Sequence, residues 1–376
     1  MKGARTRQKT HTSVFFERRL DPFRRGILLE AIPQTARNPE ISLETTHLNP
    51  LAQGELDAQR QVRVSSTPVE LLMRRLLVTI AVAFTLVVIS PQANAADAVL
   101  QNFPVGYGPI GLAFDGANIW VVNQNDRTVT KLRAIDGANQ GTFRVGRTPL
   151  EAAYDGANIW VTNFLDDTVT KLRASDGAVL GTFPAGATPT GIAFDGTSLW
   201  IANQSANTVT KLRPSDGTIE ATYNVGSNPV FVLFDGTNIW TTNSLSNNVT
   251  KLRPSDGTVL GTFNVGTGPE GIGFDGVHIW VSNNISNDLT QLLASDGTVL
   301  GTFPVGDGPQ EIAFDGNNIW VPMESDNTVW RLHANDGRLH GQLRVGRSPQ
   351  AILYDGQSMW VSDFDSNAVT KISRQP

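Results

Sequence analysis

The chain has 376 residues, of which 40% are hydrophobic and 17% charged, and its formal net charge is −5. This balance is typical of a globular protein and excludes a disordered chain of high net charge. Cysteine is absent, which excludes disulfides, thiolate catalysis and cysteine-based metal sites.

The first 95 residues differ from the rest of the chain. Residues 1–72 are polar and basic and show no sustained hydrophobic period, so we interpret them as disordered or as a misassigned N-terminal extension. Residues 73–95 read MRRLLVTIAVAFTLVVISPQANA, with two arginines, an apolar run and a small-residue cleavage site that ends at Ala95. This order of features is typical of a secretory signal peptide.

The apolar run 76–89 has 14 residues, fewer than the ~20 that a membrane-spanning helix needs. The sequence therefore predicts a periplasmic or secreted protein, cleaved near Ala95, with no membrane span in the mature chain. Met73 would then be the start of translation. The alternative is an uncleaved anchor with residues 1–72 as a cytoplasmic tail.

The charge of the exported part is more negative than that of the whole chain. Residues 1–75 hold 13 of the 30 basic and 8 of the 35 acidic residues, and residues 76–95 hold none, so residues 96–376 carry a net charge of −10. Surfaces that bind nucleic acid need clustered basic residues. This charge argues against nucleic acid as a partner.

Residues 96–376 are predicted to form one domain built from seven repeats of 40 residues. A Phe/Tyr-Asp-Gly triplet recurs at this interval without insertion or deletion, beginning at Phe114, Tyr154, Phe194, Phe234, Phe274, Phe314 and Tyr354. In every repeat, a Pro lies five residues before the triplet and a Trp six residues after its start. Repeats of this length with several short strands are typical of β-propeller blades.

Each repeat predicts four short strands, exemplified by residues 191–195, 199–203, 208–213 and 262–266. Asp-Gly turns join the first strand to the second and the third to the fourth, because Gly accepts positive φ without steric cost. The last repeat ends after its third strand, whereas residues 99–106 match the fourth strand of the other repeats. The sequence therefore predicts an all-β, seven-bladed β-propeller with four antiparallel strands per blade, closed by the N-terminal strand pairing with the last blade.

The repeat resembles the YVTN-type β-propeller family. The matching segments include IWVTN at 159–163, NTVTKL at 207–212 and TFPVG at 302–306, and the resemblance covers residues 99–376. The repeat is more distantly similar to virginiamycin B lyase and gluconolactonase-type propellers. The resemblance implies the fold but leaves binding and enzymatic roles open, because related propellers serve both.

The loops after the second and fourth strands are expected on one face of the ring, called here the top face. The repeats differ there, and such differences are not required by the shared fold. Apolar residues at the tips of the loops after the second strands are predicted to contact a ligand, since exposed apolar groups often mark interaction sites: Phe164, Leu165, Leu245, Ile285 and Phe364. The alternative is that they fold back over their blades.

Carboxylate and amide side chains near the start of the first strands are predicted at the mouth of the central channel: Glu151, Glu270, Gln310, Glu311 and Gln350. Converging carboxylates can bind a hard cation, and gluconolactonase-like propellers hold a divalent metal in their channel. A metal bound by Glu151, Glu270 and Glu311 is therefore one hypothesis, and a solvated polar channel without a cofactor is the other.

The sixth repeat departs most from the common pattern. It carries Val321-Pro322-Met323-Glu324 at the end of its second strand, where the other repeats have a pattern such as Val-Thr-Asn, and Trp330 replaces a Thr. One interpretation is a ligand site in this sector of the ring. The other is sequence drift in this one repeat. The predicted top-face ligand residues are completed by Arg147, Phe231, Asp307, Met323, Glu324 and Arg347.

An asparagine ends the second strand of five repeats, at 123, 163, 203, 243 and 283. We expect a structural role, in which the amide holds the following loop by local hydrogen bonds to the backbone. Met323 and Asp363 break this column.

The histidines after residue 95 are His278, His333 and His340, and none is predicted on the top face. Lyase-type propellers are understood to use a histidine that faces the channel, and no G-x-S-x-G nucleophile motif is present. We therefore predict a non-catalytic module that binds a protein, peptide or glycan with its top face. The alternative is a metal-dependent lactonase- or lyase-like enzyme with its site in the central channel.

Overall fold

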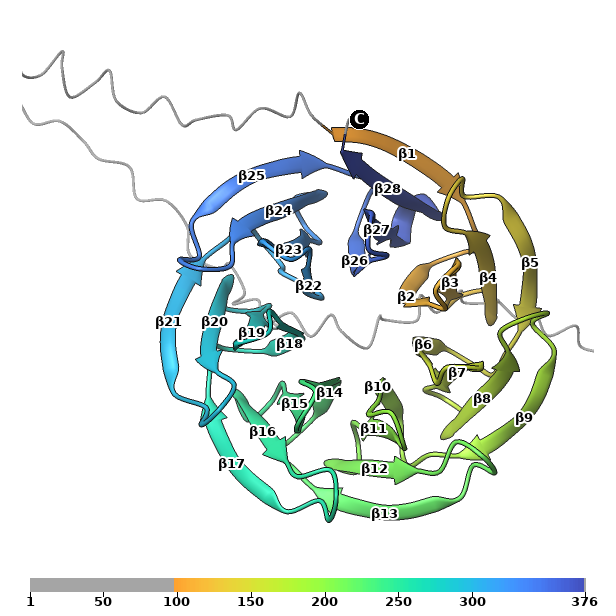
Figure 1. Cartoon of the computed structure of the whole chain (residues 1–376), viewed down its shortest axis with the longest axis horizontal. Helices are drawn as coiled ribbons and strands as arrows, with labels where there is room; N and C mark the ends of the chain where they lie inside the picture. The colour runs from red at the N-terminus through yellow and green to blue at the C-terminus, as the bar shows by residue number, and fades with distance from the viewer. Residues whose placement is uncertain (1–97, 375–376) are drawn as a thin grey trace, which may run out of the picture. The chain divides into compact units, whose positions relative to one another are not determined.

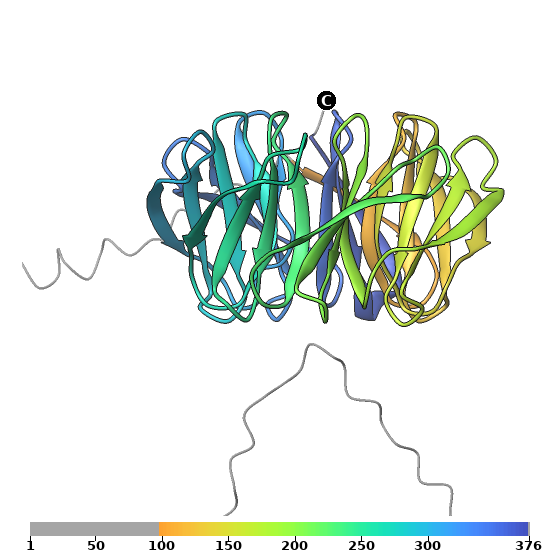
Figure 2. The ribbon, with the colours of Figure 1, turned by 90° about the horizontal axis from the view of Figure 1, so that it is seen from below.

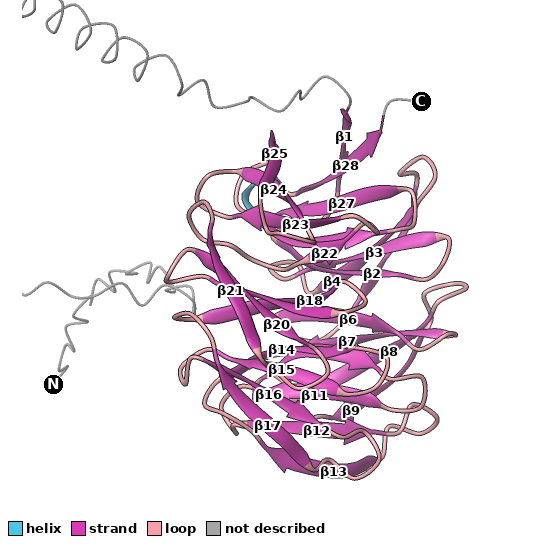
Figure 3. Cartoon of the chain, turned by 60° about the vertical axis from the view of Figure 1, so that its left-hand side comes forward, coloured by secondary structure: helices cyan, strands magenta, loops and turns pink. Residues whose placement is uncertain are grey.

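The computed structural model describes residues 98–374, so the predicted extension and signal peptide lie outside the described residues. The described part forms seven four-stranded antiparallel sheets around one axis (Figures 1 and 2). Figure 3 shows strands joined by short turns and one short 3-10 helix, η3 (Phe364–Ser366). The predicted seven-bladed β-propeller is confirmed. Within residues 98–374, no helix is long and apolar enough to cross a bilayer.

The strands of each blade run outward from the axis in chain order. The innermost strands are β2 (Pro109–Phe114), β6 (Pro149–Tyr154), β10 (Pro189–Phe194), β14 (Pro229–Phe234), β18 (Pro269–Phe274), β22 (Ala313–Phe314) and β26 (Pro349–Tyr354). The second strands are β3 (Asn118–Asn123), β7 (Asn158–Asn163), β11 (Leu199–Asn203), β15 (Ile239–Asn243), β19 (His278–Asn283), β23 (Asn318–Met323) and β27 (Ser358–Asp363).

The third strands are β4 (Thr128–Arg133), β8 (Thr168–Arg173), β12 (Thr208–Leu212), β16 (Asn248–Leu252), β20 (Asp288–Leu293), β24 (Thr328–His333) and β28 (Ala368–Arg374). The outer strands are β5 (Asn139–Arg144), β9 (Val179–Pro184), β13 (Ile219–Asn224), β17 (Val259–Asn264), β21 (Val299–Pro304) and β25 (Leu339–Arg344), and the seventh is β1 (Ala98–Pro104).

The aspartate of each repeat fixes both a turn and the core tryptophan. In the first blade, Asp115 Oδ1 accepts hydrogen bonds from the backbone amides of Ala117 and Asn118, which closes the turn. Its Oδ2 accepts a 2.8 Å hydrogen bond from Trp120 Nε1. The same Trp–Asp bond occurs in all seven blades. A buried Trp needs a partner for its N–H, and the turn supplies it.

A lysine in the third strand fastens neighbouring blades together. Lys131 Nζ lies 5.1 Å from the ring centroid of Trp120 and donates a 2.7 Å hydrogen bond to the carbonyl of Ala174 in the next blade. The bond recurs between later blades, including one from Lys371 to Ala134 that joins the last blade to the first. Carbonyl oxygens and the aromatic face stabilise this largely buried ammonium.

The N-terminal strand closes the ring as predicted. In Figure 1 β1 lies outside β28, and their antiparallel register runs from Ala98 opposite Arg374 to Pro104 opposite Ala368. The terminal blade is therefore built from both ends of the described chain. The chain passes directly from β1, the outer strand of the last blade, to β2, the inner strand of the first blade.

A buried carboxyl marks this closure. Asp363 is fully buried, and its Oδ2 lies 2.5 Å from the hydroxyl of Thr370, which also lies 2.8 Å from Asn102 Oδ1 on β1. Burial raises the pKa of Asp363 to about 7, although the bond from Thr370 acts in the opposite direction. A hydroxyl has only one proton to donate. A protonated Asp363 allows both hydrogen bonds to form, because its carboxyl can donate to the hydroxyl of Thr370 while that hydroxyl donates to Asn102.

Candidate functional site

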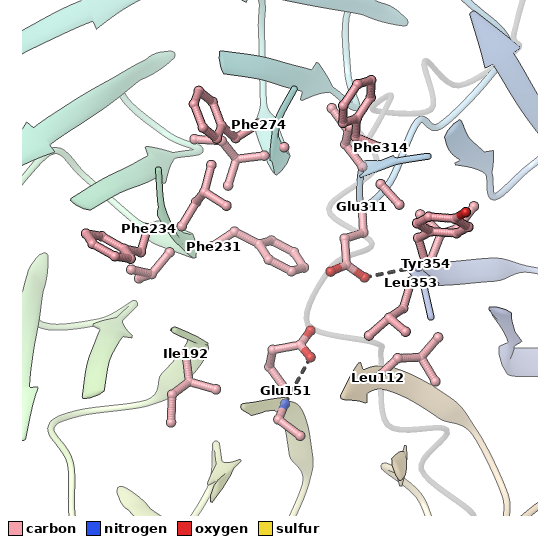
Figure 4. Close-up of a pocket in the computed structure, with 18 residues that line it drawn as sticks. Leu112, Glu151, Ile192, Phe231, Phe234, Phe274, Glu311, Phe314, Leu353 and Tyr354 are labelled. Atoms are coloured by element: carbon pink, nitrogen blue, oxygen red, sulfur yellow. Dashed lines mark hydrogen bonds between the residues drawn. The ribbon is translucent and has the colours of Figure 1, made fainter. Parts of the chain in front are cut away.

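Seven residues, the third of each inner-strand segment, form a layer across the central channel: Gly111, Glu151, Gly191, Phe231, Gly271, Glu311 and Ala351. Three of the small residues allow close contact between blades. A Cβ added to Gly111 would lie 2.4 Å from the carbonyl oxygen of Leu150, and one added to Gly271 would lie 2.3 Å from that of Gln310. The three large residues of the layer, Glu151, Phe231 and Glu311, extend into the channel (Figure 4).

Glu151 and Glu311 point toward one another across the channel, and the ring of Phe231 points into the same space (Figure 4). Glu151 Oε1 accepts a 2.9 Å hydrogen bond from the amide of Ala152. Glu311 Oε2 accepts a 3.1 Å hydrogen bond from the amide of Ile352 in the neighbouring blade. The carboxyl groups are thus held by backbone donors, and within residues 98–374 no cationic side chain pairs with either.

The electrostatics of this pair differ from those of surface carboxylates. Burial raises the pKa of Glu151 to about 8, although backbone hydrogen bonds lower it. Burial also raises the pKa of Glu311, and the neighbouring charge of Glu151 raises it further. Two desolvated carboxylates that face one another cannot both be charged without a large cost. Near neutral pH the pair therefore holds a proton or attracts a cation.

The carboxyl groups line a cavity of about 430 Å³. Its other lining side chains are mostly apolar and include Leu112, Ile192, Ile272, Ile352 and Leu353, although polar atoms make up the larger part of the exposed lining surface. The lining continues to the last residues of the inner strands, Phe234, Phe274, Phe314 and Tyr354. The cavity therefore occupies the part of the channel between the glutamate layer and the Asp-Gly turns, on the side opposite the top-face loops.

This geometry corrects two expectations about the channel. Glu151 and Glu311 do not sit at the top-face mouth, and Phe231 faces the channel rather than a top-face ligand. Glu270 is one residue earlier in its strand than they are in theirs and does not line the cavity. The three glutamates therefore do not form the metal cluster that the sequence suggested.

The donor set also fits a divalent metal poorly. Calcium takes six to eight oxygen ligands, and the rest of the cavity wall is mostly aliphatic and aromatic. Among the described residues, no three histidine, aspartate or glutamate side chains gather in a way that suits a metal ion.

The top face carries exposed aliphatic side chains in three blades. Leu165, Leu245 and Ile285 occupy equivalent loop positions and are 46%, 73% and 70% exposed. The equivalent residues of the other blades are polar: Asn125, Ser205, Ser325 and Asp365. Tyr107, in the loop after β1, is 63% exposed on the same face, and its carbonyl accepts a hydrogen bond from the amide of Asn125. Tyr107 was not predicted from the sequence, although Arg147, Asp307 and Arg347, which were predicted, occupy the equivalent position in other repeats.

Two aromatic residues predicted on this face are not freely exposed. Phe164 is only 8% exposed, which contradicts a role as a protruding contact. Phe364 is half-buried in η3, and its ring lies close to Gly108 of the first blade. Neither residue protrudes as a ligand contact: Phe164 is buried, and Phe364 packs against the neighbouring first blade and not over its own.

The predicted rim arginines brace their own loops. Arg147 pairs with Asp166 and donates a 2.8 Å hydrogen bond to the carbonyl of Leu165. Arg347 donates a 3.0 Å hydrogen bond to the carbonyl of Asp365. Both guanidinium groups thereby hold an exposed loop tip in place.

The remaining polar candidates join blades five, six and seven. Glu324 accepts hydrogen bonds from Gln310 Nε2 at 2.9 Å and from the hydroxyl of Ser348 at 3.3 Å. Gln350 Nε2 donates to the same hydroxyl at 3.2 Å. Asp307 accepts a 2.9 Å bond from Asn287 Nδ2 in the preceding blade.

The asparagine column has the structural role that was expected, but with different partners. Asn123 Nδ2 donates to the hydroxyls of Thr128 and Thr130, at 3.0 and 2.9 Å. Its carbonyl oxygen accepts from the amide of Gly106 in the loop that leads into the blade. The side chain therefore links the second strand to the third strand and to the preceding loop.

The sixth blade replaces this polar network with an apolar pair. Met323 is fully buried and belongs to the same core cluster as Trp330, which contradicts its predicted place among the ligand contacts. Thr328, which would bond to an asparagine at 323, has an unpartnered buried hydroxyl, and Trp330 has an unpartnered Nε1. The two substitutions compensate one another in packing and leave two polar atoms unsatisfied.

The histidines lie away from the channel cavity. His278 starts β19, and its Nδ1 lies 2.9 Å from Asp275 Oδ2. His333 and His340 stack with their ring centroids 4.4 Å apart. None of the three lines the cavity.

No family model matches the chain, and no curated protein matches it either. Solved structures similar to it include a streptogramin B lyase, with 20% identity and a TM-score of 0.64 over 74% of this chain and 98% of that one. A catalytically inactive virginiamycin B lyase from Staphylococcus aureus, solved with quinupristin, has 20% identity and a TM-score of 0.64 over 74% and 99%. Hydrazine synthase from Kuenenia stuttgartiensis has 19% identity and a TM-score of 0.63 over 71% and 95%. At such identities the likeness establishes the seven-bladed fold alone.

Proposed function

We propose that this protein is a non-catalytic binding module that engages a protein or peptide partner with its top face. The observation that carries the proposal is the exposure of Leu165, Leu245 and Ile285 at loop positions where four sister blades have polar residues. The blades share one scaffold, so the fold does not require these aliphatic tips. Their exposure to water is unfavourable unless a partner covers them.

The chemistry of the rim favours a polypeptide over a glycan. Sugar rings are usually bound against aromatic faces, whereas the three protruding tips are aliphatic and Phe164 is buried. Tyr107 adds an aromatic group with a polar end, a residue type enriched in protein interfaces. Arg147 and Arg347 would keep the loops in place for such a partner, since each holds a loop carbonyl.

The N-terminal features support a cellular context for this role. A signal peptide at residues 73–95 would deliver the propeller to the periplasm or the medium, and the YVTN-type repeat pattern is consistent with an exported propeller. The partner would then be a component of the envelope or of the surroundings.

The competing proposal is a metal-dependent lyase- or lactonase-like enzyme in the channel. It draws on the fold likeness to the lyase structures and on the facing carboxyl groups of Glu151 and Glu311. It has less support, because Glu270 does not join the pair and His278, His333 and His340 lie elsewhere. Metal analysis after dialysis and a thermal shift with EDTA test it, since an enzyme of this class would retain metal and lose stability.

A triple variant tests the binding proposal. We expect Leu165→Ser, Leu245→Ser and Ile285→Ser together to abolish co-purification of one defined partner from envelope and culture-medium proteins of the source organism. The control is Leu180→Ser, Leu260→Ser and Leu300→Ser, which removes three exposed leucines, 43%, 42% and 49% exposed, from the outer strands. The proposal fails if the control loses the same partner, or if no binding depends on the rim residues.

A further inference from the structure

We propose that the channel cavity is a second binding site, which takes a small organic ammonium ion with an apolar body. The ammonium group would lie between the carboxyl groups of Glu151 and Glu311, against the ring of Phe231, and the body would fill the apolar part of the cavity. This site is separate from the top-face rim, and it goes beyond the proposed function.

No cationic side chain among residues 98–374 compensates the charge that the glutamate pair carries once its proton is lost. Glu151 is more than nine-tenths buried, and the groups on its carboxyl are backbone amides. Glu311 extends from the opposite side of the ring toward it. Within residues 98–374, no lysine, arginine or histidine forms an ion pair with either of them. A buried carboxylate pair without a cation is unfavourable. A cationic ligand between the two carboxylates would therefore be attracted by each of them.

Phe231 is placed to support a cation beside the pair. It is the third large side chain in the layer, and it points toward the space between the two glutamates (Figure 4). A cation against an aromatic face is attracted by the ring quadrupole, most strongly where water is excluded. An ammonium group has three N–H donors, which suits two carboxyl groups and leaves one side for the ring.

The cavity wall distinguishes an amine from a metal ion. Apart from Glu151, Glu311 and Tyr354, the side chains that line the cavity are apolar, and they include Ile192, Ile272 and Leu353. A hard cation would keep most of its water there, whereas an organic ammonium places its charge on the carboxyl groups and its body on the apolar walls. The cavity of about 430 Å³ is within the usual size of small-molecule sites.

Proton release gives a readout that a purely structural role would not produce. Besides Glu151 and Glu311, Tyr354 is the one titratable side chain among the described residues of the lining. Near neutral pH the carboxyl pair shares a proton, and an ammonium ion would displace it. Binding should therefore release protons, which calorimetry in two buffers of different ionisation enthalpy measures.

The test uses the full chain and four probes: phenethylammonium, 2-phenylethanol, 3-phenylpropanoate and calcium chloride. We expect phenethylammonium to bind with a stoichiometry of one and to release protons. The alcohol and the carboxylate have similar size and lack the cation, so both should bind at least tenfold more weakly. Equal binding of the amine and the alcohol would overturn the proposal, and so would calcium binding without amine binding.

Variants locate the site. The double change Glu151→Gln and Glu311→Gln should weaken phenethylammonium binding at least tenfold, and Phe231→Leu should weaken it severalfold. Glu220→Gln is the matched control, because Glu220 lies on the outer strand β13 and bonds to Arg213 and Ser198. If the double variant does not fold, Glu311→Gln and Phe231→Leu keep the test decisive. Unchanged affinity in these variants would refute the site.

A rim variant separates this proposal from the proposed function. The triple serine variant at Leu165, Leu245 and Ile285 should bind phenethylammonium normally, because none of these residues lines the cavity. Loss of amine binding in that variant would contradict a site confined to the channel. Loss of the protein partner with retained amine binding would support both proposals independently.

Discussion

Lys371, in the last blade, donates a 2.7 Å hydrogen bond from its ammonium group to the carbonyl oxygen of Ala134 in the first blade. A further bond joins it to the carbonyl of Ile135 at 3.0 Å, and its Nζ lies 5.1 Å from the ring centroid of Trp360. Residues 237 positions apart are thereby held together at the seam of the ring. The contact adds to the strand pairing of β1 and β28.

Replacing Lys371 by Met should destabilise the propeller by about 1–3 kcal/mol, because it removes the donor to the buried carbonyl of Ala134 and to the part-buried carbonyl of Ile135. Chemical denaturation monitored by tryptophan fluorescence measures this loss. Arg253→Met is the control, because Arg253 pairs with Asp256 at the surface and surface pairs contribute about 0–1 kcal/mol. Equal losses of unfolding free energy in the two variants would show that the Lys371 contact contributes no more to stability than a surface ion pair.

Asp363→Asn should raise stability most at alkaline pH. Burial raises the pKa of Asp363 to about 7, so between about pH 4 and pH 7 the folded protein keeps a proton that the unfolded chain releases. The free energy of unfolding of the wild type therefore falls as the pH rises from about 4. Above pH 7 this loss reaches its full value of about 2–4 kcal/mol. An asparagine also restores the donor found in five sister blades.

Thermal unfolding of wild type and Asp363→Asn between pH 4 and pH 9 checks this expectation. The melting temperatures should nearly coincide at pH 4 and diverge toward pH 8. A constant difference across the range would mean that Asp363 does not titrate in the folded protein.

Glu151→Gln should lower the pKa of Glu311. The charge of Glu151 raises the pKa of Glu311 in addition to burial, and glutamine removes that charge with little change in shape. Carboxyl ¹³C shifts followed through a pH titration report the change. In Glu220→Gln, which alters an outer strand, the pKa of Glu311 should stay where it is in wild type.

Met323→Asn and Trp330→Thr should rescue one another in the sixth blade. Met323→Asn alone lets the amide bond to Thr328 but leaves it beside the indole of Trp330 in an apolar cluster, and we expect this partly satisfied amide to cost about 1–2 kcal/mol. With Trp330→Thr as well, the amide can bond to Thr328 and to the introduced hydroxyl, as the amide of Asn123 bonds to two threonines in the first blade. A double-mutant cycle on urea midpoints should show a favourable coupling, and additive losses would refute the compensation.

The repeat made the fold predictable in detail. Seven copies at one interval indicated seven blades, and the match of residues 99–106 to the outer strands indicated the closure now seen as β1 beside β28. The regularity of the pattern also identified Asn123 and its equivalents as structural. Their partners, Thr128 and Thr130, were not predicted, because bonds between side chains on adjacent strands depend on register.

The site was predictable only in part. Glu151 and Glu311 stood out because four other blades carry Gly or Ala and the fifth carries Phe231 in their place, and the two glutamates do face one another in the channel. Their depth was missed, since it depends on how the inner strands are placed along the axis. Met323 and Phe164 were assigned to the surface because their burial depends on packing against residues such as Trp330, which one repeat alone does not reveal.

The channel layer has a consequence for the number of blades. Small and large residues alternate around it from Gly111 to Ala351, but an odd ring cannot alternate throughout, so two small residues must be neighbours. They are Ala351 and Gly111, on either side of the junction between the last blade and the first. Parity requires one such pair in a seven-bladed ring, and in this chain the pair falls where the two ends of the propeller meet, where the layer carries a methyl group instead of a glycine hydrogen. A ring with one blade more or one blade fewer could alternate throughout and would contain no such pair.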